Sequence, residues 1–206
     1  MKMKAKTSNE VIVLPLSHHG NNSPHLLKLT PPQTALLVVD LQERLLSAIH
    51  EAAGCMAAAG RMIRAAKVLE VPVVMAEQYP AGLGATCAEI REAAGPSCTA
   101  IKKMRFTACV EQTVERLREM QRRAVIVVGI EAHVCVQQTV LDLLRLGFGP
   151  FVCADAVSSR RPMDREVALD RMSRAWAVVT TTESVIFELL DRAGTDQFKQ
   201  ILRIVK

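Results

Sequence analysis

The fold class follows most directly from the stretch Ala124-Val125-Ile126-Val127-Val128-Gly129-Ile130-Glu131-Ala132-His133-Val134-Cys135. Residues 124–128 are a short, continuous, mostly β-branched run, which is typical of a strand that helices cover on both faces. A helix is predicted over residues 134–146. In parallel α/β sheets, ligands bind beyond the carboxyl ends of the strands, so residues 129–135 are expected to line a functional site.

The rest of the chain repeats this alternation of apolar strand and helix. Strands are expected at residues 35–39, 71–75, 100–101, 124–128, 150–154 and 177–180, and helices at 42–69, 110–121, 134–146, 165–175, 183–190 and 197–204. Residues 77–98 are rich in glycine and proline and are expected to form a long loop. The alternation predicts right-handed crossovers and a mostly parallel sheet with helices on both faces, which is an α/β fold.

The chain has 206 residues, which is the size of one domain with one sizeable core. Residues 1–33 are expected to be an irregular lead-in that ends at Pro31-Pro32, and residues 34–206 to form the domain. Aromatic residues make up only 3% of the chain, so the core is predicted to consist of aliphatic side chains. This composition favours helices packed on a sheet over a β-sandwich, and it leaves few rings for stacking nucleic-acid bases.

The formal net charge is +5, but basic and acidic residues are mixed along the predicted helices. The densest basic stretch, residues 116–123, is interpreted as a solvated helix face, so no nucleic-acid partner is expected. The excess of positive charge favours anionic small substrates through long-range steering.

Cysteine usage indicates a reducing compartment. The six cysteines form no C-x-x-C pair, and their spacing to histidines suggests no zinc cage. We find no secretory signal and no apolar run near the roughly 18 residues that a membrane span needs. A cytoplasmic location, free thiols and no membrane partner are therefore expected.

Three predicted strands are followed by chemically useful residues: Asp40 after the first, Lys102 and Lys103 after the strand at 100–101, and Cys135 after residues 124–128. A free cysteine has a pKa of about 8.5, and a helix start with a nearby lysine is expected to lower it. Asp40 is suited to accept the thiol proton and return it to a leaving group. Each residue also has a purely structural interpretation: a buried cysteine, a capping aspartate and a surface lysine.

Taken together, these segments resemble a known family. Val38-Val39-Asp40-Leu41-Gln42, Lys103 three residues before Phe106, and Gly129 to Val136 are similar to the isochorismatase-like cysteine hydrolases. The resemblance runs from about residue 34 to the C-terminus, and residues 76–84 and 155–160 look most like the isochorismatase domain-containing branch.

The resemblance implies a six-stranded parallel sheet and an Asp40–Lys103–Cys135 triad, with Lys102 as the alternative lysine. It implies a cysteine thioester, formed from a small amide, imide or ester without a cofactor. It also implies a non-proline cis peptide bond between Ile130 and Glu131, and an oxyanion hole made by the N–H groups of Glu131 and Cys135. Substrate contacts are expected from Gln42, Tyr79, Phe106, His133 and Arg160.

Two departures from the family pattern matter. Metal-dependent nicotinamidases carry histidines after the second strand, whereas this chain has none between His50 and His133, so no metal is expected. A Glu131 carboxylate beside the oxyanion hole would oppose negative charge there unless a cation such as Arg160 pairs with it. An inactive scaffold or binding protein of the same fold is the main alternative. Nicotinamidase, isochorismatase and nucleic-acid-processing activities rank lower.

Two further expectations concern packing. Trp176, the only tryptophan, is expected to begin a strand in the core. Phe198, Ile201, Leu202 and Val205 share one face of the last predicted helix, which either covers the sheet or contacts another copy. Because the related proteins tend to associate, a homo-oligomer is predicted, with this helix or the helix from Val134 in the contact.

Overall fold

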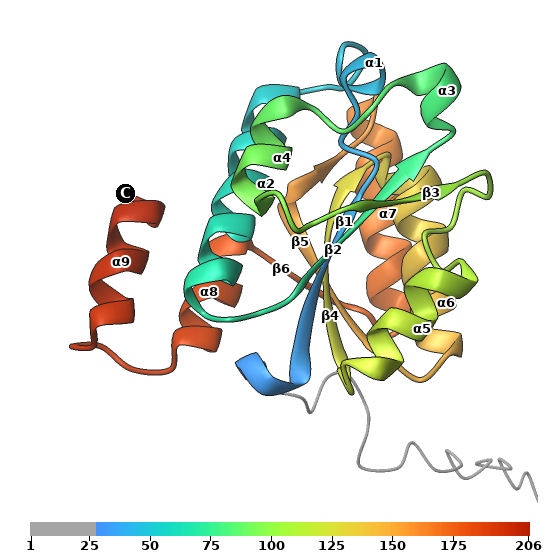
Figure 1. Cartoon of the computed structure of the whole chain (residues 1–206). Helices are drawn as coiled ribbons and strands as arrows, with labels where there is room; N and C mark the ends of the chain where they lie inside the picture. Colours follow the sequence, from blue (N-terminus) through green and yellow to red (C-terminus); the bar gives the residue numbers. More distant parts are fainter. Residues whose placement is uncertain (1–27) are drawn as a thin grey trace, which may run out of the picture.

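The computed structural model describes residues 28–206, and its centre is a parallel sheet (Figure 1). Six strands lie in the order β3-β2-β1-β4-β5-β6, and every neighbouring pair is parallel. The predicted α/β fold is therefore confirmed. The strands are β1 Thr34–Val39, β2 Val73–Gln78, β3 Ala100–Lys103, β4 Ala124–Ile130, β5 Gly149–Ser158 and β6 Val178–Thr180.

Helices flank both faces of this sheet and account for most of the remaining chain (Figure 1). They are the short 3₁₀ turn η2 Pro31–Gln33, α1 Glu43–Leu46, α2 Ala52–Val68, α3 Pro80–Leu83, α4 Ala88–Ala94, α5 Glu111–Glu119, the π-helical turn η3 Ala132–Val136, α6 Gln137–Arg145, α7 Pro162–Arg174, α8 Thr182–Leu190 and α9 Asp196–Val205. None of the helices within residues 28–206 is long and apolar enough to cross a bilayer.

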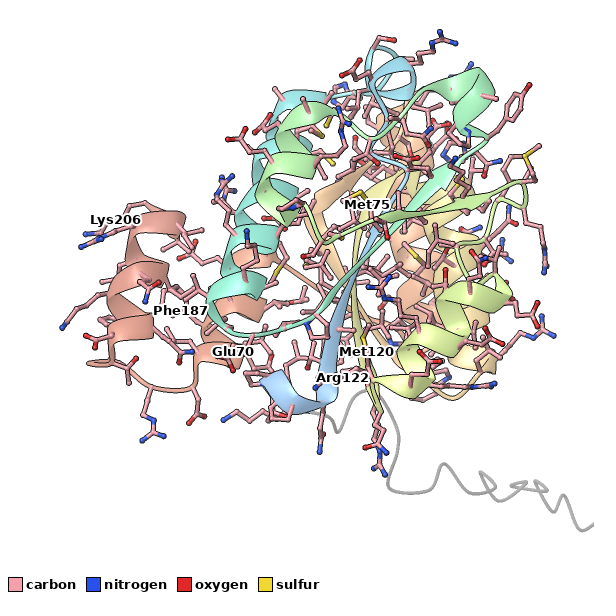
Figure 2. The ribbon with its side chains drawn as sticks, viewed as in Figure 1. Glu70, Met75, Met120, Arg122, Phe187 and Lys206 are labelled. Carbon is pink, nitrogen blue, oxygen red and sulfur yellow. The ribbon has the colours of Figure 1, made fainter. Side chains whose placement is uncertain are left out.

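Two apolar cores lie on opposite faces of the sheet because successive side chains of a strand point to opposite sides. Leu36 and Val38 of β1 pack in the core under α2, α4, α8 and α9. Leu37 and Val39 pack in the core under α5, α6 and α7. All six residues of β1 are buried, which explains why this strand is a continuous apolar run. Figure 2 shows Met75 of β2 among the packed side chains and Lys206 at the outer edge.

The predicted helix over residues 42–69 is wrong in its middle. Residues 47–51 separate α1 from α2, and Glu51 adopts a left-handed backbone conformation (φ 51°). The backbone N–H of His50 donates to the carbonyl of Ser159, 3.0 Å away, after β5. This bond to a distant segment takes the N–H out of any continuous helix, and the local pattern does not reveal it.

The predicted long loop over residues 77–98 is also wrong, because it contains the end of β2 and two helices. Pro80 is the first residue of α3, where its missing N–H costs nothing. Gly84 and Gly95 cap α3 and α4 with φ values of 78° and 86°. The glycines and prolines therefore mark helix ends, which is one of their usual positions.

Three smaller expectations also need correction. The helix expected at residue 134 begins with η3 at Ala132. β5 runs on to Ser158, and the Asp155 carboxylate inside it accepts hydrogen bonds from the N–H and hydroxyl of Thr182 at 2.9 and 2.5 Å. Trp176 is 54% exposed with φ 78°, in the turn between α7 and β6, so it is not a core residue.

The apolar stripe of α9 packs on its own chain. Ile201 is fully buried, and Phe198, Ile204 and Val205 pack against the core shared with α2 and α8. The Gln197 side chain also donates to the carbonyl of Val68 at the end of α2, at 3.1 Å. Three of the four predicted stripe residues therefore cover the core, Leu202 is not among the residues packed on it, and the predicted homo-oligomer draws no support from the three.

The described chain begins beside α8. The Leu29 side chain is buried, and its N–H donates to the Glu188 carboxylate at 2.7 Å. Lys28 pairs with Asp191 at 2.5 Å. Residues 28–33 are thus attached to the domain, while the expected irregular lead-in over residues 1–27 lies outside the described residues.

Candidate active site

Four adjacent strands bring the candidate residues to one edge of the sheet. Lys103 ends β3, Gln78 ends β2, Asp40 follows β1, and η3 with Cys135 follows β4. Asp40 has a left-handed backbone conformation (φ 52°), which aspartate tolerates better than most residues. Its N–H donates to the Ala76 carbonyl on β2 at 3.1 Å. This bond fixes the backbone that carries the Asp40 carboxylate.

Lys103 and Asp40 form a fully buried ion pair. Lys103 Nζ lies 2.7 Å from Asp40 Oδ2, and both side chains are inaccessible to solvent. The ammonium also donates to Gln78 Oε1 at 2.7 Å and to the Phe106 carbonyl at 2.9 Å. With the Arg105 carbonyl at 3.4 Å, four oxygens surround the three protons of the ammonium group. Lys102 is exposed, so Lys103 is the lysine that contacts Asp40.

The other oxygen of Asp40 is in a different situation. Oδ1 is buried and has no hydrogen-bond partner of regular geometry within residues 28–206. The Cys135 thiol lies close enough to the Asp40 carboxylate for hydrogen bonding between them to affect the pKa of both groups. Because Oδ2 is engaged by Lys103, Oδ1 is the atom available to take a proton from the thiol.

Burial and charge set the resting protonation of Cys135. Burial raises the pKa of this thiol to about 12; the Asp40 charge also raises it, and Lys103 opposes both effects. The expectation of a lowered pKa is therefore wrong in its net direction, although Lys103 acts in the expected sense. Cys135 is only 6% exposed, and a carboxylate lies beside it, so one cation does not offset the cost of a second negative charge.

The carboxyl group of Asp40 also has a raised pKa. Burial raises the pKa of its carboxyl group above the ordinary value, and the charge and hydrogen bond of Lys103 oppose that rise. A carboxylate with a raised pKa is a better proton acceptor than an ordinary aspartate. A thiol with a raised pKa therefore lies beside a carboxyl group with a raised pKa, an arrangement that suits proton exchange between them.

Gln42 is fully buried and its amide bonds within the protein, and its expected contact with substrate stays a prediction. Its Nε2 donates to the carbonyls of Gln78 and Gly84 at 3.0 and 2.5 Å, and its Oε1 accepts from the Gln78 N–H at 2.8 Å. These bonds fix the backbone at the end of β2. Gln78 itself was missed, because the sequence places it in a loop three residues beyond the predicted strand end.

Tyr79 and Phe106 lie next to Lys103 and are exposed by 47% and 54%. The N–H of Tyr79 donates to the Lys103 carbonyl at 2.8 Å. A pocket of about 560 Å³ adjoins these residues, and it is lined by Tyr79, Pro80, Ala81, Lys102, Lys103 and Met104. Both aromatic side chains are thus accessible at this edge of the sheet, and their expected contact with substrate stays a prediction.

The Glu131 carboxylate is paired with Arg160, the cation that the sequence suggested as the partner that would balance its charge. Arg160 Nε lies 2.9 Å from Glu131 Oε2, and the Arg160 N–H donates to the same oxygen at 3.1 Å. The peptide bond between Ile130 and Glu131 is cis. His133 Nδ1 lies 3.0 Å from Ser159 Oγ, so this ring is tied to the segment after β5.

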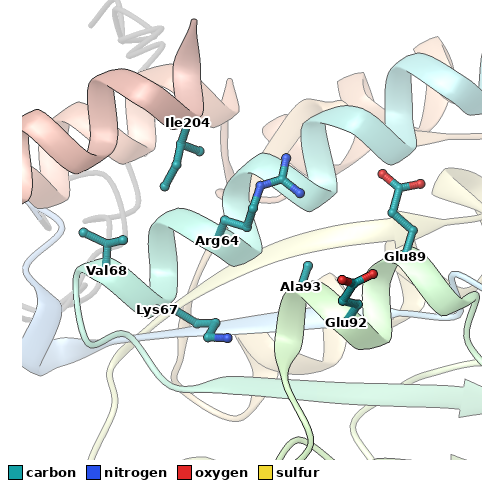
Figure 3. Close-up of a pocket in the computed structure, with 7 residues that line it drawn as sticks. All are labelled: Arg64, Lys67, Val68, Glu89, Glu92, Ala93 and Ile204. Atoms are coloured by element: carbon teal, nitrogen blue, oxygen red, sulfur yellow. The ribbon is translucent and has the colours of Figure 1, made fainter.

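A second pocket lies away from this edge, where α2 and α4 meet the end of α9 (Figure 3). It has a volume of about 550 Å³ and is lined by Arg64, Lys67, Val68, Glu89, Glu92, Ala93 and Ile204. None of the candidate catalytic residues reaches it. Across residues 28–206, no three His, Cys, Asp or Glu side chains are grouped so that they could hold a metal ion.

Comparison with known proteins identifies the family. The family model of the isochorismatase domain matches residues 34–184. "Isochorismatase domain-containing protein 1" of Salmo salar is 38% identical over 86% of this chain, and the alignment spans 62% of that relative's length. The "Secreted isochorismatase effector Isc1" of Phytophthora sojae is 38% identical over 87% of each chain. The expected cytoplasmic location stays a prediction, since this relative is secreted.

Solved structures agree with this family assignment. The MAR1 ribonuclease of Caenorhabditis elegans superposes with a TM-score of 0.84 and 37% identity, over 87% of this chain and 92% of that one. YcaC of Pseudomonas aeruginosa, solved with hexane-2,5-diol and covalent acrylamide, gives 0.79 and 25% identity, over 86% and 91%. The chain therefore belongs to the isochorismatase family, whose domain it carries over residues 34–184.

Proposed function

We propose that the protein is a metal-independent hydrolase that attacks a small amide, imide or ester through Cys135. The observation that carries this proposal is that the two carboxylate oxygens of Asp40 have different surroundings. One carboxylate oxygen is held by Lys103 at 2.7 Å, while the other is buried, lacks a regular partner in the described chain, and is available to Cys135. This arrangement suits an aspartate that exchanges one proton with a thiol.

The proposed reaction begins when Asp40 Oδ1 takes the proton of Cys135 Sγ and the sulfur attacks the substrate carbonyl carbon. The new C–S bond creates an oxyanion, which the backbone N–H groups of Glu131 and Cys135 stabilise. Asp40 then gives its proton to the leaving nitrogen or oxygen, and a thioester remains. Asp40 next takes a proton from water, the resulting hydroxide attacks the thioester, and the returning proton regenerates the Cys135 thiol. General acid–base help of this kind contributes about 10²–10⁴-fold.

Three further observations support this function. The Lys103 ammonium lies beside the pair and lowers the pKa of both groups, so it stabilises negative charge on either of them. Arg160 balances Glu131, so this side chain does not oppose an oxyanion. The YcaC relative holds covalent acrylamide, an electrophilic amide that requires a nucleophile. Acrylamide is therefore a suitable probe for Cys135.

Replacing Asp40 with asparagine is expected to change labelling and turnover in opposite directions. In the wild type, the rate of Cys135 labelling should rise with pH while Asp40 ionises and then stay nearly level, because the carboxylate is then fully available to take the thiol proton. Direct ionisation of a thiol with a pKa of about 12 adds to the rate only at higher pH. Asp40→Asn removes that carboxylate, so the labelling rate should no longer have a pH range over which it stays level. At about pH 9 the variant should label at least tenfold faster, while hydrolysis falls about 10²–10⁴-fold for lack of a proton donor.

Mass spectrometry of the Cys135 peptide after timed acrylamide exposure measures the labelling. Turnover is measured on a panel of small amides, imides and esters. Cys135→Ser serves as the control that removes both the adduct and hydrolysis, and Cys98 in the same digest reports a partly exposed thiol whose pKa Asp40 does not affect. Identical pH profiles for wild type and Asp40→Asn, together with no hydrolysis of the panel, would instead favour an inactive binding protein.

RNA cleavage is a second candidate because the C. elegans relative is named a ribonuclease. The burial of Asp40 and Cys135 argues against it, since the phosphate of a polymer has poor access to two groups beneath the surface. Incubation of single-stranded RNA with wild type and Cys135→Ser tests this. RNA loss that depends on Cys135 would move the assignment to a ribonuclease.

A further inference from the structure

We propose that Gln78 is a positioning residue that holds the Lys103 ammonium against Asp40, and that Gln42 holds Gln78. This inference rests on the proposed function, because it concerns the same Asp40–Cys135 pair. Gln78 lies outside the expected triad and has its effect through Lys103, without a role in bond making.

The orientation of the Gln78 amide follows from its two partners. Its Oε1 accepts from Lys103 Nζ at 2.7 Å, and its Nε2 donates to the Met104 carbonyl at 3.0 Å. The reverse orientation would place an NH₂ group against the ammonium and an oxygen against a carbonyl. Gln78 and Lys103 are also partners in the β2–β3 register, so the backbone brings the two side chains together.

Gln42 fixes the backbone of Gln78 from the side of β1. It bonds to both the N–H and the carbonyl of Gln78, at 2.8 and 3.0 Å. Gln42 lies two residues after Asp40, and its N–H donates to the Asp40 carbonyl at 2.7 Å. Asp40, the proposed base, and Gln78, which holds its counterion Lys103, are therefore both bonded to Gln42.

Removal of the Gln78 oxygen would take away one of the two shortest hydrogen bonds of the buried ammonium, and the fourth oxygen near it, the Arg105 carbonyl, lies 3.4 Å away. An unsatisfied buried donor is costly, so Lys103 is expected to shift toward other oxygens or water. A displaced Lys103 would stabilise the Asp40 carboxylate less, and the pKa of Asp40 would rise further because burial would be less opposed.

The groups that face Asp40 are few, so this effect can be isolated. Lys103 of β3 and Cys135 of η3 are the titratable groups that affect its pKa, together with the backbone of Gln78. The nearby Glu131 and His133 side chains bond instead to Arg160 and Ser159.

The test measures acrylamide labelling of Cys135 between about pH 4 and pH 10 in wild type, Gln78→Met and Gln78→Asn. Methionine keeps the size of glutamine without its amide, and asparagine keeps the amide but is too short to reach Lys103. In both variants, the pH at which the rate becomes level should move up by about one unit. Below that pH, labelling should fall roughly tenfold.

Two controls separate positioning from loosening of the fold. Glu77→Gln changes the preceding residue of β2, whose side chain bonds to Thr86, and should leave the profile unchanged. Cys153 is fully buried, so its labelling in the same sample reports unfolding. If Gln78→Met exposes Cys153, the Gln78→Asn profile decides.

The outcomes distinguish this inference from the proposed function. Suppose that the labelling rate of Cys135 depends on pH in the same way in both Gln78 variants as in the wild type, and that Asp40→Asn removes the pH range over which this rate is level. That result would overturn the positioning role of Gln78 and leave the hydrolase proposal standing. If the labelling rate of Cys135 in the wild-type protein has no level pH range that depends on Asp40, both the positioning role and the hydrolase proposal are overturned.

Discussion

Gly129→Ala is expected to abolish the native fold, with a loss of about 4 kcal/mol or more in the free energy of unfolding. Gly129 has φ 131°, a conformation that residues with a side chain rarely adopt. A methyl group there would overlap the backbone carbonyl of Val39, its partner in the β1–β4 pair. Both segments lie in the middle of the sheet, so neither can move aside.

Urea denaturation followed by circular dichroism measures this effect. Gly54→Ala is the matched control, because Gly54 lies inside α2 with open space around its Cα. This change should stabilise the protein by about 0.5–1 kcal/mol, since alanine is a better helix former. Stability of Gly129→Ala within about 1 kcal/mol of the wild type would show that the β1–β4 pair can separate locally.

Lys103→Met is expected to destabilise the protein by about 3–5 kcal/mol near pH 8, because it leaves the Asp40 carboxylate buried and unpaired. The loss should shrink as the pH falls. The folded-state pKa of Asp40 is already raised and would rise further without Lys103. The folded state then binds more protons than the unfolded state, so stability is greatest at low pH and falls as pH rises through the folded pKa.

The double variant Asp40→Asn/Lys103→Met supplies the control. It contains neither charge, so it should be more stable than Lys103→Met near pH 8 and should lack this pH dependence. Urea denaturation at about pH 5 and pH 8 measures all three proteins. Equal stability of Lys103→Met at the two pH values would contradict a buried ionised Asp40.

The positions of the strands were largely predictable from the sequence. Each of the six expected strands overlaps an observed one, because a strand covered on both faces must be apolar throughout. The ends were less predictable. β5 continues through Asp155 to pair Val157 and Ser158 with Gly129 and Ile130, and the charge in this strand is accommodated by Thr182 from a later helix.

The candidate site was predictable in part. Asp40, Cys135 and the pair Lys102 and Lys103 were candidates because they follow predicted strand ends, and the family resemblance implied the triad with Lys103. The structure brings Asp40 and Lys103 into contact. Gln78 and the role of Gln42 were not found, because an amide in a chain segment carries no signal of its bonding partner. Gln42 reaches Gln78 across 36 residues, and Lys103 reaches Asp40 across 63.

The sequence by itself determined which segments are apolar, where helices alternate with strands, and which reactive residues stand at strand ends. Only the tertiary structure decided the protonation of those residues. The low pKa expected for Cys135 rested on a helix start and on Lys103, whereas its pKa of about 12 follows from burial and from a carboxylate 95 positions earlier. Apolar patterning is a local property of the chain, but solvent exclusion and charge pairing depend on which strand ends meet in space.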